Sequence, residues 1–149
     1  MNSDEGPPDE EVLTILLYAS DRTTRESVRL ALGRKIAPDL PQIRILEVAT
    51  QSALISAMDA GGINLAILDG EAVPGGMGLC RQLKDEILRC PPIMLLIGRP
   101  DDAWLATWSR ADGALSHPVD PVRLPAALAK LLRPRMSTET AIVQTTSVA

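Results

Sequence analysis

The chain has 149 residues, a net charge of −4 and 46% hydrophobic residues, which suits one globular domain with a core of its own. It contains two Trp, one Tyr and no Phe, so aliphatic side chains must build most of that core. Five acidic residues fall within residues 1–12, and the rest of the chain is close to neutral. This distribution argues against nucleic-acid binding through a strongly basic surface.

The sequence carries no membrane or export signal. No apolar run reaches the roughly 18 residues that a membrane-spanning helix needs, and the N-terminus lacks the pattern of a signal peptide. We therefore expect a cytoplasmic protein without direct membrane insertion. Cys80 and Cys90 have no partner motif, and we expect reduced packing thiols rather than a disulfide or a metal site.

Short apolar runs alternate with helix-like segments along the chain. Strands are predicted at 13–18, 43–48, 64–69, 92–97 and 113–116. Helices are predicted at 25–32, 52–60, 78–88, 101–111 and 121–132. Gly61 and Gly62 suit the end of the second helix, Asp101 and Asp102 can cap the fourth, and Pro121 suits the first turn of the last.

Five apolar strands, each followed by a helix, predict a parallel sheet that is buried on both faces. We therefore expect one doubly wound α/β domain over residues 13–133. Residues 1–12 are acidic and contain Pro7 and Pro8, and residues 134–149 are weakly patterned. Both segments are predicted to be flexible tails.

In an open parallel sheet, ligands bind at the carboxyl ends of the strands. The segments at those ends are 19–21, 69–71, 97–99 and 116–118. After Asp69 comes a glycine-rich loop, 75–78, which could hold a phosphate at a helix start. The loop lacks the P-loop and dinucleotide-binding patterns, and the need for a tight turn accounts for it.

The strand that ends in Asp69, followed by AVPGGMGL, resembles the phosphoacceptor segment of bacterial response-regulator receiver domains. PPIMLLIGRPDDAW is similar to the fourth strand of that family and its exit, and GALSHPVDPVRL to the fifth strand and the start of the last helix. The resemblance covers residues 13–133. It implies a receiver, or flavodoxin-like, fold with strand order 2-1-3-4-5 and helices on both faces.

The family's phosphorylation chemistry uses an acidic pair that holds a divalent cation, a hydroxyl and a lysine, because an anionic phosphoryl group must be neutralised. The matching positions of this chain are Ala19 and Ser20, Ile97, and His117. Asp21, one place after the acidic pair, would be at most a weak metal ligand. The resemblance therefore implies a degenerate pseudo-receiver with no catalytic residue, metal or cofactor.

Asp69 is the vestigial phosphoacceptor in this interpretation. We expect its carboxylate to be hydrogen-bonded to nearby amides and to His117 rather than phosphorylated. His117 is predicted to be a satisfied side chain before a cis Pro118. Glu71 is expected to be solvated, and Ala114 stands where receivers often have a switching aromatic residue.

Trp104 and Trp108 are four residues apart on the predicted fourth helix and share one of its faces. Trp is favoured in interface hot spots, and in receivers this helix belongs to the customary protein-docking surface. The absence of Phe favours the alternative that a Trp fills the core. We expect one Trp to be buried and the other to be at least partly exposed, as a docking residue.

These features favour a non-enzymatic, phosphorylation-independent docking module with a protein partner. Three segments, LAILDGEAVPGGMGLCRQLKDE, CPPIMLLIGRPDDAWLATWSRA and HPVDP, also resemble an actinobacterial group of orphan, degenerate receivers. That group is linked to the type I NADH dehydrogenase of the respiratory chain. The resemblance implies an accessory subunit on the cytoplasmic arm of this enzyme, complex I, with membrane association through the partner complex alone.

Two alternatives stay open at this point. The first is a single-domain response regulator of a two-component system, phosphorylated on Asp69 with Asp21 as an improvised metal ligand. The second is a small-ligand domain that uses the loop 75–78. Because 16 residues follow Arg133, we expect no DNA-binding domain after the receiver-like part.

Overall fold

The computed structural model describes the backbone of residues 11–147 and the side chains of residues 11–136. The strands are β1 (Val12–Tyr18), β2 (Gln42–Val48), β3 (Leu65–Asp69), β4 (Ile93–Ile97) and β5 (Gly113–Ser116). The helices are α1 (Arg22–Leu32), α2 (Gln51–Ala60), α3 (Gly76–Glu86), the 3₁₀ turn η1 (Pro100–Asp102), α4 (Ala103–Trp108) and α5 (Arg123–Ser147). The strands form one parallel sheet in the order β2-β1-β3-β4-β5, which confirms the predicted fold class and strand order.

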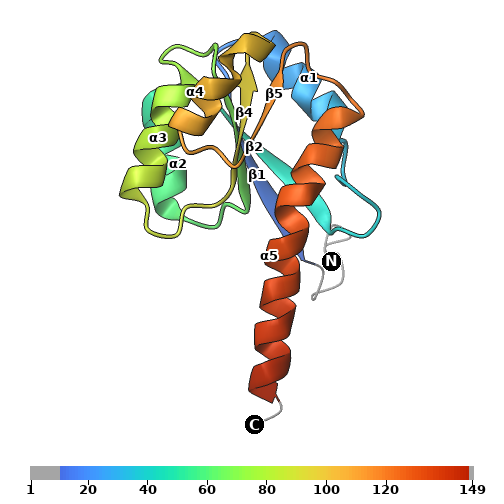
Figure 1. The fold of residues 1–149 in the computed structure, drawn as a ribbon. Helices are drawn as coiled ribbons and strands as arrows, with labels where there is room; N and C mark the ends of the chain where they lie inside the picture. Colours follow the sequence, from blue (N-terminus) through green and yellow to red (C-terminus); the bar gives the residue numbers. More distant parts are fainter. Residues whose placement is uncertain (1–10, 148–149) are drawn as a thin grey trace, which may run out of the picture.

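The sheet is covered on both faces (Figure 1). Leu13, Ile15 and Leu17 of β1 belong to the core that includes residues of α1 and α5. Leu16 and Tyr18, which alternate with them, belong to the core that includes residues of α2, α3 and α4. Because successive strand side chains point to opposite faces, the continuous apolar runs in the sequence supply both cores.

Local signals bound the first two helices, and of these the glycine end of α2 was predicted from the sequence. The Asp21 carboxylate accepts a hydrogen bond from Thr23 N at the start of α1, and Thr50 Oγ1 accepts one from Ala53 N at the start of α2. Gly61 follows α2 with a φ of 79°, a backbone conformation that glycine adopts without steric cost. The predicted helix bounds are therefore close to the observed ones in this half of the chain.

The prediction for the fourth helix, 101–111, is wrong in its bounds and its cap. Pro100 opens the 3₁₀ turn η1, in which Asp102 N donates to Arg99 O over 2.9 Å. The two aspartates lie within this turn, and Asp102 makes no side-chain capping hydrogen bond to α4. The helix that follows is therefore only six residues long.

α5 also differs from the prediction of 121–132. It begins at Arg123, where Asp120 Oδ1 accepts hydrogen bonds from the backbone N–H groups of Val122 and Arg123. It continues through Pro134 to Ser147 and runs well past the sheet (Figure 1). Residues 134–147, which belong to the predicted flexible tail 134–149, are helical, and Met136 packs against the core near the start of this continuation.

The N-terminal prediction is mostly untested, because residues 1–10 lie outside the described part of the chain and Val12 already belongs to β1. The division of the chain into a body and two tails stays a prediction.

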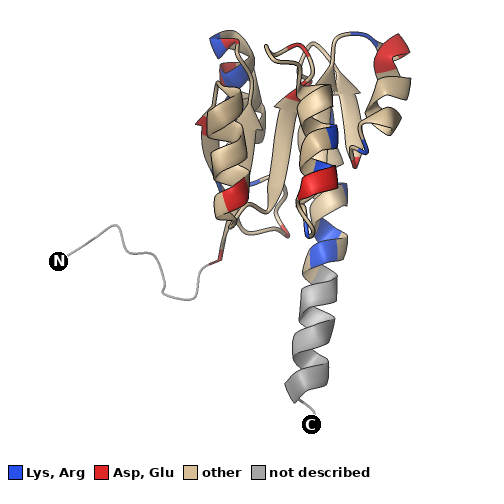
Figure 2. Ribbon diagram, turned by 90° about the vertical axis from the view of Figure 1, so that its left-hand side faces the viewer, with Lys and Arg blue, Asp and Glu red and all other residues tan. Residues whose placement is uncertain are grey.

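Basic and acidic residues are both spread over the body in the view of Figure 2, and neither sign covers it. Among the described residues, no helix combines the length and the apolar character that crossing a bilayer requires.

Candidate functional site

A cavity of about 490 Å³ opens at the carboxyl ends of the central strands. Its lining consists of Ser20, Asp21, Thr24, Asp69, Glu71, Gly98 and His117. The register explains this meeting, because Asp69 pairs with Leu96 and Ile97 pairs with Ser116, so the strands end side by side. The structure therefore brings together Ser20, Asp21, Asp69, Glu71 and His117 from the sequence prediction.

Asp69 is almost fully buried, with 3% of its surface exposed. Its Oδ1 atom lies 2.9 Å from His117 Nε2 and accepts a hydrogen bond from Glu71 N over 3.0 Å. The peptide bond between His117 and Pro118 is cis. The predicted hydrogen bonds of Asp69 and the cis Pro118 are thus confirmed, and the carboxylate is bound by groups of its own chain.

The β1–α1 turn holds the positions where the family has its acidic pair. Ala19 is fully buried and has no polar side-chain atom. Ser20 Oγ accepts a hydrogen bond from Val73 N over 2.8 Å and so ties this turn to the β3–α3 loop. The Asp21 carboxylate caps α1 and also accepts a hydrogen bond from Thr24 Oγ1 over 3.3 Å.

These residues do not fit the divalent cation that the receiver resemblance implies. Divalent hard cations prefer carboxylate and carbonyl oxygen ligands, and the acidic pair is replaced by Ala19 and Ser20. No group of three or more His, Cys, Asp or Glu residues in the described part of the chain could hold a metal ion. Asp21 is engaged at its helix start, and Asp69 is engaged by His117 and by Glu71 N. Glu71 supplies the remaining carboxylate of the cavity lining.

Arg25 is a site residue that the sequence prediction missed. Its Nη1 atom donates to Ala19 O over 2.6 Å and to Ser20 O over 3.1 Å. Its Nε atom lies 3.5 Å from Glu47 Oε1 on β2. The guanidinium therefore holds the β1–α1 turn in place from α1. The position of Arg25 in an amphipathic helix gave no sign of this contact.

The positions of the family's hydroxyl and lysine offer different chemistry here. Ile97 is buried with 3% exposure and carries no hydrogen-bonding side-chain group. His117 is shorter than lysine, and it is engaged with Asp69. Glu71, expected to be solvated, is exposed, yet its carboxylate lies so close over Gly98 that a Cβ atom there would overlap Glu71 Oε1.

Tyr18 is a second residue that the sequence prediction missed. Its ring is fully buried, and its hydroxyl donates to Pro74 O over 2.7 Å. Burial and, secondarily, the negative charge of Asp69 raise the pKa of the phenol. Tyr18 therefore remains a hydrogen-bond donor that anchors the β3–α3 loop beneath the cavity.

The glycine loop is shaped by close packing. A Cβ atom on Gly76 would overlap the backbone carbonyl oxygen of Asp69, so any larger residue would push the start of α3 away from β3. Gly78, in contrast, has open space around its Cβ position. Contact between backbone atoms accounts for glycine at position 76, as the expected tight turn requires.

Both tryptophans are exposed, Trp104 at 66% and Trp108 at 48%. The prediction that one would be buried is therefore wrong. The core beneath α4 is filled by Leu, Ile, Met and Cys side chains, and Ala106 is the buried residue of this short helix. Arg81 stacks over the Trp108 ring at 4.8 Å, and its Nη1 atom donates to Trp108 O over 2.7 Å.

Comparison with known proteins identifies the family. No family model matches the chain. Two proteins of Mycobacterium tuberculosis, from strains CDC 1551 and H37Rv, are each 56% identical to it over 128 residues, which cover 85% of this chain and 96% of theirs. Both are named uncharacterized response regulatory proteins. The chain belongs to the response-regulator receiver family.

Solved structures agree with this assignment at the level of the fold. A two-component transcriptional regulator from Clostridium phytofermentans has a TM-score of 0.70 at 18% identity, covering 87% of this chain and 98% of its own. The chemotaxis protein CheY4 of Vibrio cholerae has a TM-score of 0.65 at 17% identity, covering 82% of this chain and 100% of its own. The receiver fold is thereby confirmed.

Proposed function

We propose that this response-regulator receiver is a non-enzymatic pseudo-receiver that docks onto a partner protein without phosphorylation of Asp69. One observation carries the proposal: the groups that would neutralise an acyl phosphate are replaced, and His117 already occupies Asp69 Oδ1 at 2.9 Å. Ala19 offers no cation ligand and Ile97 no hydrogen bond. A phosphoryl group on Asp69 would therefore meet little of the electrostatic stabilisation that its transfer needs.

The α4 surface supports the docking role. The α4 surface consists of Trp104 and Trp108 of α4 and of Arg81 of α3, which contacts Trp108. Trp104 exposes two thirds of its surface, and Arg81 holds Trp108 in one orientation through ring stacking and a backbone hydrogen bond. Large, pre-ordered aromatic side chains of this kind are favoured as binding hot spots, because little conformational entropy is lost when they are covered.

The partner that we propose is the cytoplasmic arm of a type I NADH dehydrogenase, with this chain as an accessory subunit of complex I. Support comes from the three sequence segments that resemble the actinobacterial orphan receivers linked to that enzyme. Under this proposal the chain is located in the cytoplasm and reaches the membrane through the complex.

Affinity purification of the tagged chain from native membranes and from cytosol tests the docking role. Trp104→Ala and Trp108→Ala should each reduce the co-purified partner by about tenfold or more, the effect of losing a hot-spot residue of 1.4 kcal/mol or above. Asp69→Asn should leave the yield unchanged. Leu88→Ala removes an apolar side chain elsewhere that is even more exposed than either Trp and serves as the control. Equal yields from all variants would contradict the assignment of the interface to α4.

Incubation with Mg²⁺ and either acetyl phosphate or beryllofluoride tests the phosphorylation-independent part. We expect no stable mass increase and no saturable change of Trp fluorescence. A saturable change that disappears in Asp69→Asn would overturn the proposal and support a two-component phosphoacceptor in its place.

A further inference from the structure

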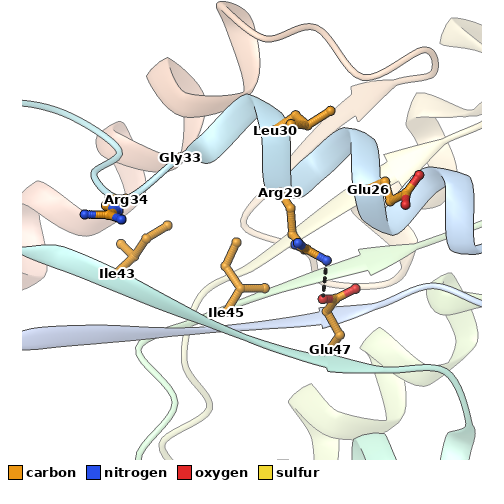
Figure 3. Close-up of a pocket in the computed structure, with 8 residues that line it drawn as sticks. All are labelled: Glu26, Arg29, Leu30, Gly33, Arg34, Ile43, Ile45 and Glu47. Carbon is orange, nitrogen blue, oxygen red and sulfur yellow. Dashed lines mark hydrogen bonds and ion pairs between the residues drawn. The ribbon is translucent and has the colours of Figure 1, made fainter.

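A groove of about 720 Å³ lies between α1 and β2, at the opposite edge of the sheet from β5. Figure 3 shows Ile43 and Ile45 between Arg34 and Arg29, with Leu30 above them. Leu30 is 85% exposed, and the two isoleucines are half-buried.

β2 is an edge strand whose first two residues are already covered: Lys35 forms an antiparallel bridge with Gln42, and Ile43 N donates to Arg34 O over 2.8 Å. Beyond Ile43 no strand pairs with this edge in the described part of the chain, and the groove presents apolar side chains beside it, a combination that native proteins usually cover.

The groove lies in a basic part of the chain. Residues 22–48 contain six Arg or Lys residues and three Asp or Glu residues. Each of the three acidic residues is already paired: Glu26 with Arg22, Asp39 with Arg133, and Glu47 with Arg25 and Arg29. Arg34 and Lys35 form no ion pair with any residue in the range 11–136, so one end of the groove carries uncompensated positive charge.

The segment that precedes β1 has the complementary chemistry. Residues 1–10 read MNSDEGPPDE, with an acidic pair on each side of Pro7 and Pro8. The segment leads into Val12, which pairs with Gln42, the first residue of β2. Ten extended residues span about 33 Å, and the seven residues of β2 span about 23 Å. The segment is therefore long enough to follow the whole groove.

We propose that residues 1–10 bind in the groove between α1 and β2 of their own chain. Pro7 and Pro8 cover Leu30 and Ile43, and an acidic pair faces Arg34. Proline lacks the N–H donor of a sheet ladder, so the segment covers the edge through side-chain contacts rather than as a sixth strand. The covalent link supplies an effective concentration in the millimolar range, which favours this segment over a peptide from another molecule.

This surface is separate from the α4 surface, and its role is different. The bridge between Lys35 and Gln42 covers only the start of β2. With the acidic segment over the remainder, the edge cannot pair with the edge strand of another molecule, and edge-to-edge association is prevented. Weakening the segment should therefore expose the groove without changing the docking of α4 to its partner.

Methyl-labelled NMR of the full chain tests the proposal. We expect nuclear Overhauser effects between the Pro7 or Pro8 ring protons and the methyl groups of Leu30 and Ile43. These effects should disappear in a variant with Asp4, Glu5, Asp9 and Glu10 changed to the matching amides, and in Arg34→Gln. Lys130→Gln, an exposed basic residue of α5, is the matched control and should keep them.

Two results would overturn the proposal. The first is identical Leu30, Ile43 and Ile45 methyl shifts in the unchanged chain and in the amide variant, which would mean that the segment does not lie in the groove. The second is an effect seen only between differently labelled copies in a mixed sample, which would assign the groove to the segment of a second molecule.

Discussion

The cavity at the carboxyl end of the sheet and the α4 surface differ in how their side chains are used. In the cavity, Asp69, His117 and Ser20 bind one another or nearby backbone atoms. On the α4 surface, Trp104 is largely exposed, and the ring of Trp108 is held by Arg81. The cavity lies where the family has its chemistry, yet the more exposed apolar surface lies on α4.

The side chains of the cavity contribute to the free energy of folding, whereas those of the α4 surface contribute to the free energy of binding a partner. A buried polar group costs free energy unless it is hydrogen-bonded, so the partners of Asp69 stabilise the fold and leave few groups for a ligand. An exposed Trp contributes little to folding, but its apolar area becomes favourable once a partner removes it from water. Substitutions should therefore affect stability at the cavity and binding at α4.

Gly76→Ala should produce the largest loss of stability, about 2 to 3 kcal/mol, because its methyl group overlaps the Asp69 carbonyl and overpacking has costs of this size. Urea unfolding followed by circular dichroism measures it. Gly78→Ala is the matched control on the same helix, with open space for a methyl group, and should be neutral or slightly stabilising. A loss below 0.5 kcal/mol for Gly76→Ala, on the order of measurement error, would show that α3 shifts freely.

His117→Ala should lower the free energy of unfolding by about 2 kcal/mol, because a buried carboxylate loses one of its partners. The double variant with Asp69→Ala should lose less than the sum of the two single losses, since both remove the same contact. Strict additivity in this cycle would mean that the 2.9 Å contact contributes nothing to stability.

Arg81→Ala should have an intermediate effect, a loss of about 1 kcal/mol from the stacking contact and the backbone hydrogen bond. Tryptophan emission should also shift to longer wavelength as the ring of Trp108 becomes more hydrated. Arg89→Ala, a nearby exposed arginine, is the comparison variant. An unchanged emission spectrum would show that Arg81 does not hold the ring in solution.

Trp104→Ala should have the smallest effect on folding, within about 0.5 kcal/mol of the unchanged protein, as is usual for exposed positions. Thermal unfolding measures it. A loss above about 1 kcal/mol would assign Trp104 a structural role and weaken the contrast between the two regions.

The sequence was sufficient for the architecture because the relevant signals are local. The fifth strand was predicted with its observed bounds, 113–116, and the first differs by one residue. Runs that are apolar on both faces define parallel strands directly. The bounds of α4 and α5 were wrong, because they depend on the 3₁₀ turn at Pro100 and on the contact of Met136 with the core.

The candidate site was predictable where strand ends fix the positions, as for Asp69 and His117. Tyr18 was missed because its partner is set by tertiary structure: Pro74 is 56 residues away. Arg25 was missed for another reason, because its bonds to backbone oxygens of the preceding turn depend on the geometry of that turn and leave no sequence pattern. The burial of one Trp was predicted from the absence of Phe, a property of composition that says nothing about the space available under α4.

The contact between Arg25 and the β1–α1 turn has a consequence for cations. A guanidinium keeps its charge at every physiological pH, and this one is bound to the carbonyl oxygens of residues 19 and 20. A divalent ion approaching those oxygens would meet acceptors that already bind Arg25 and a fixed like charge behind them. The turn thus contains a permanent internal cation. Carboxylates restored at positions 19 and 20 alone would recreate a metal site only in competition with Arg25.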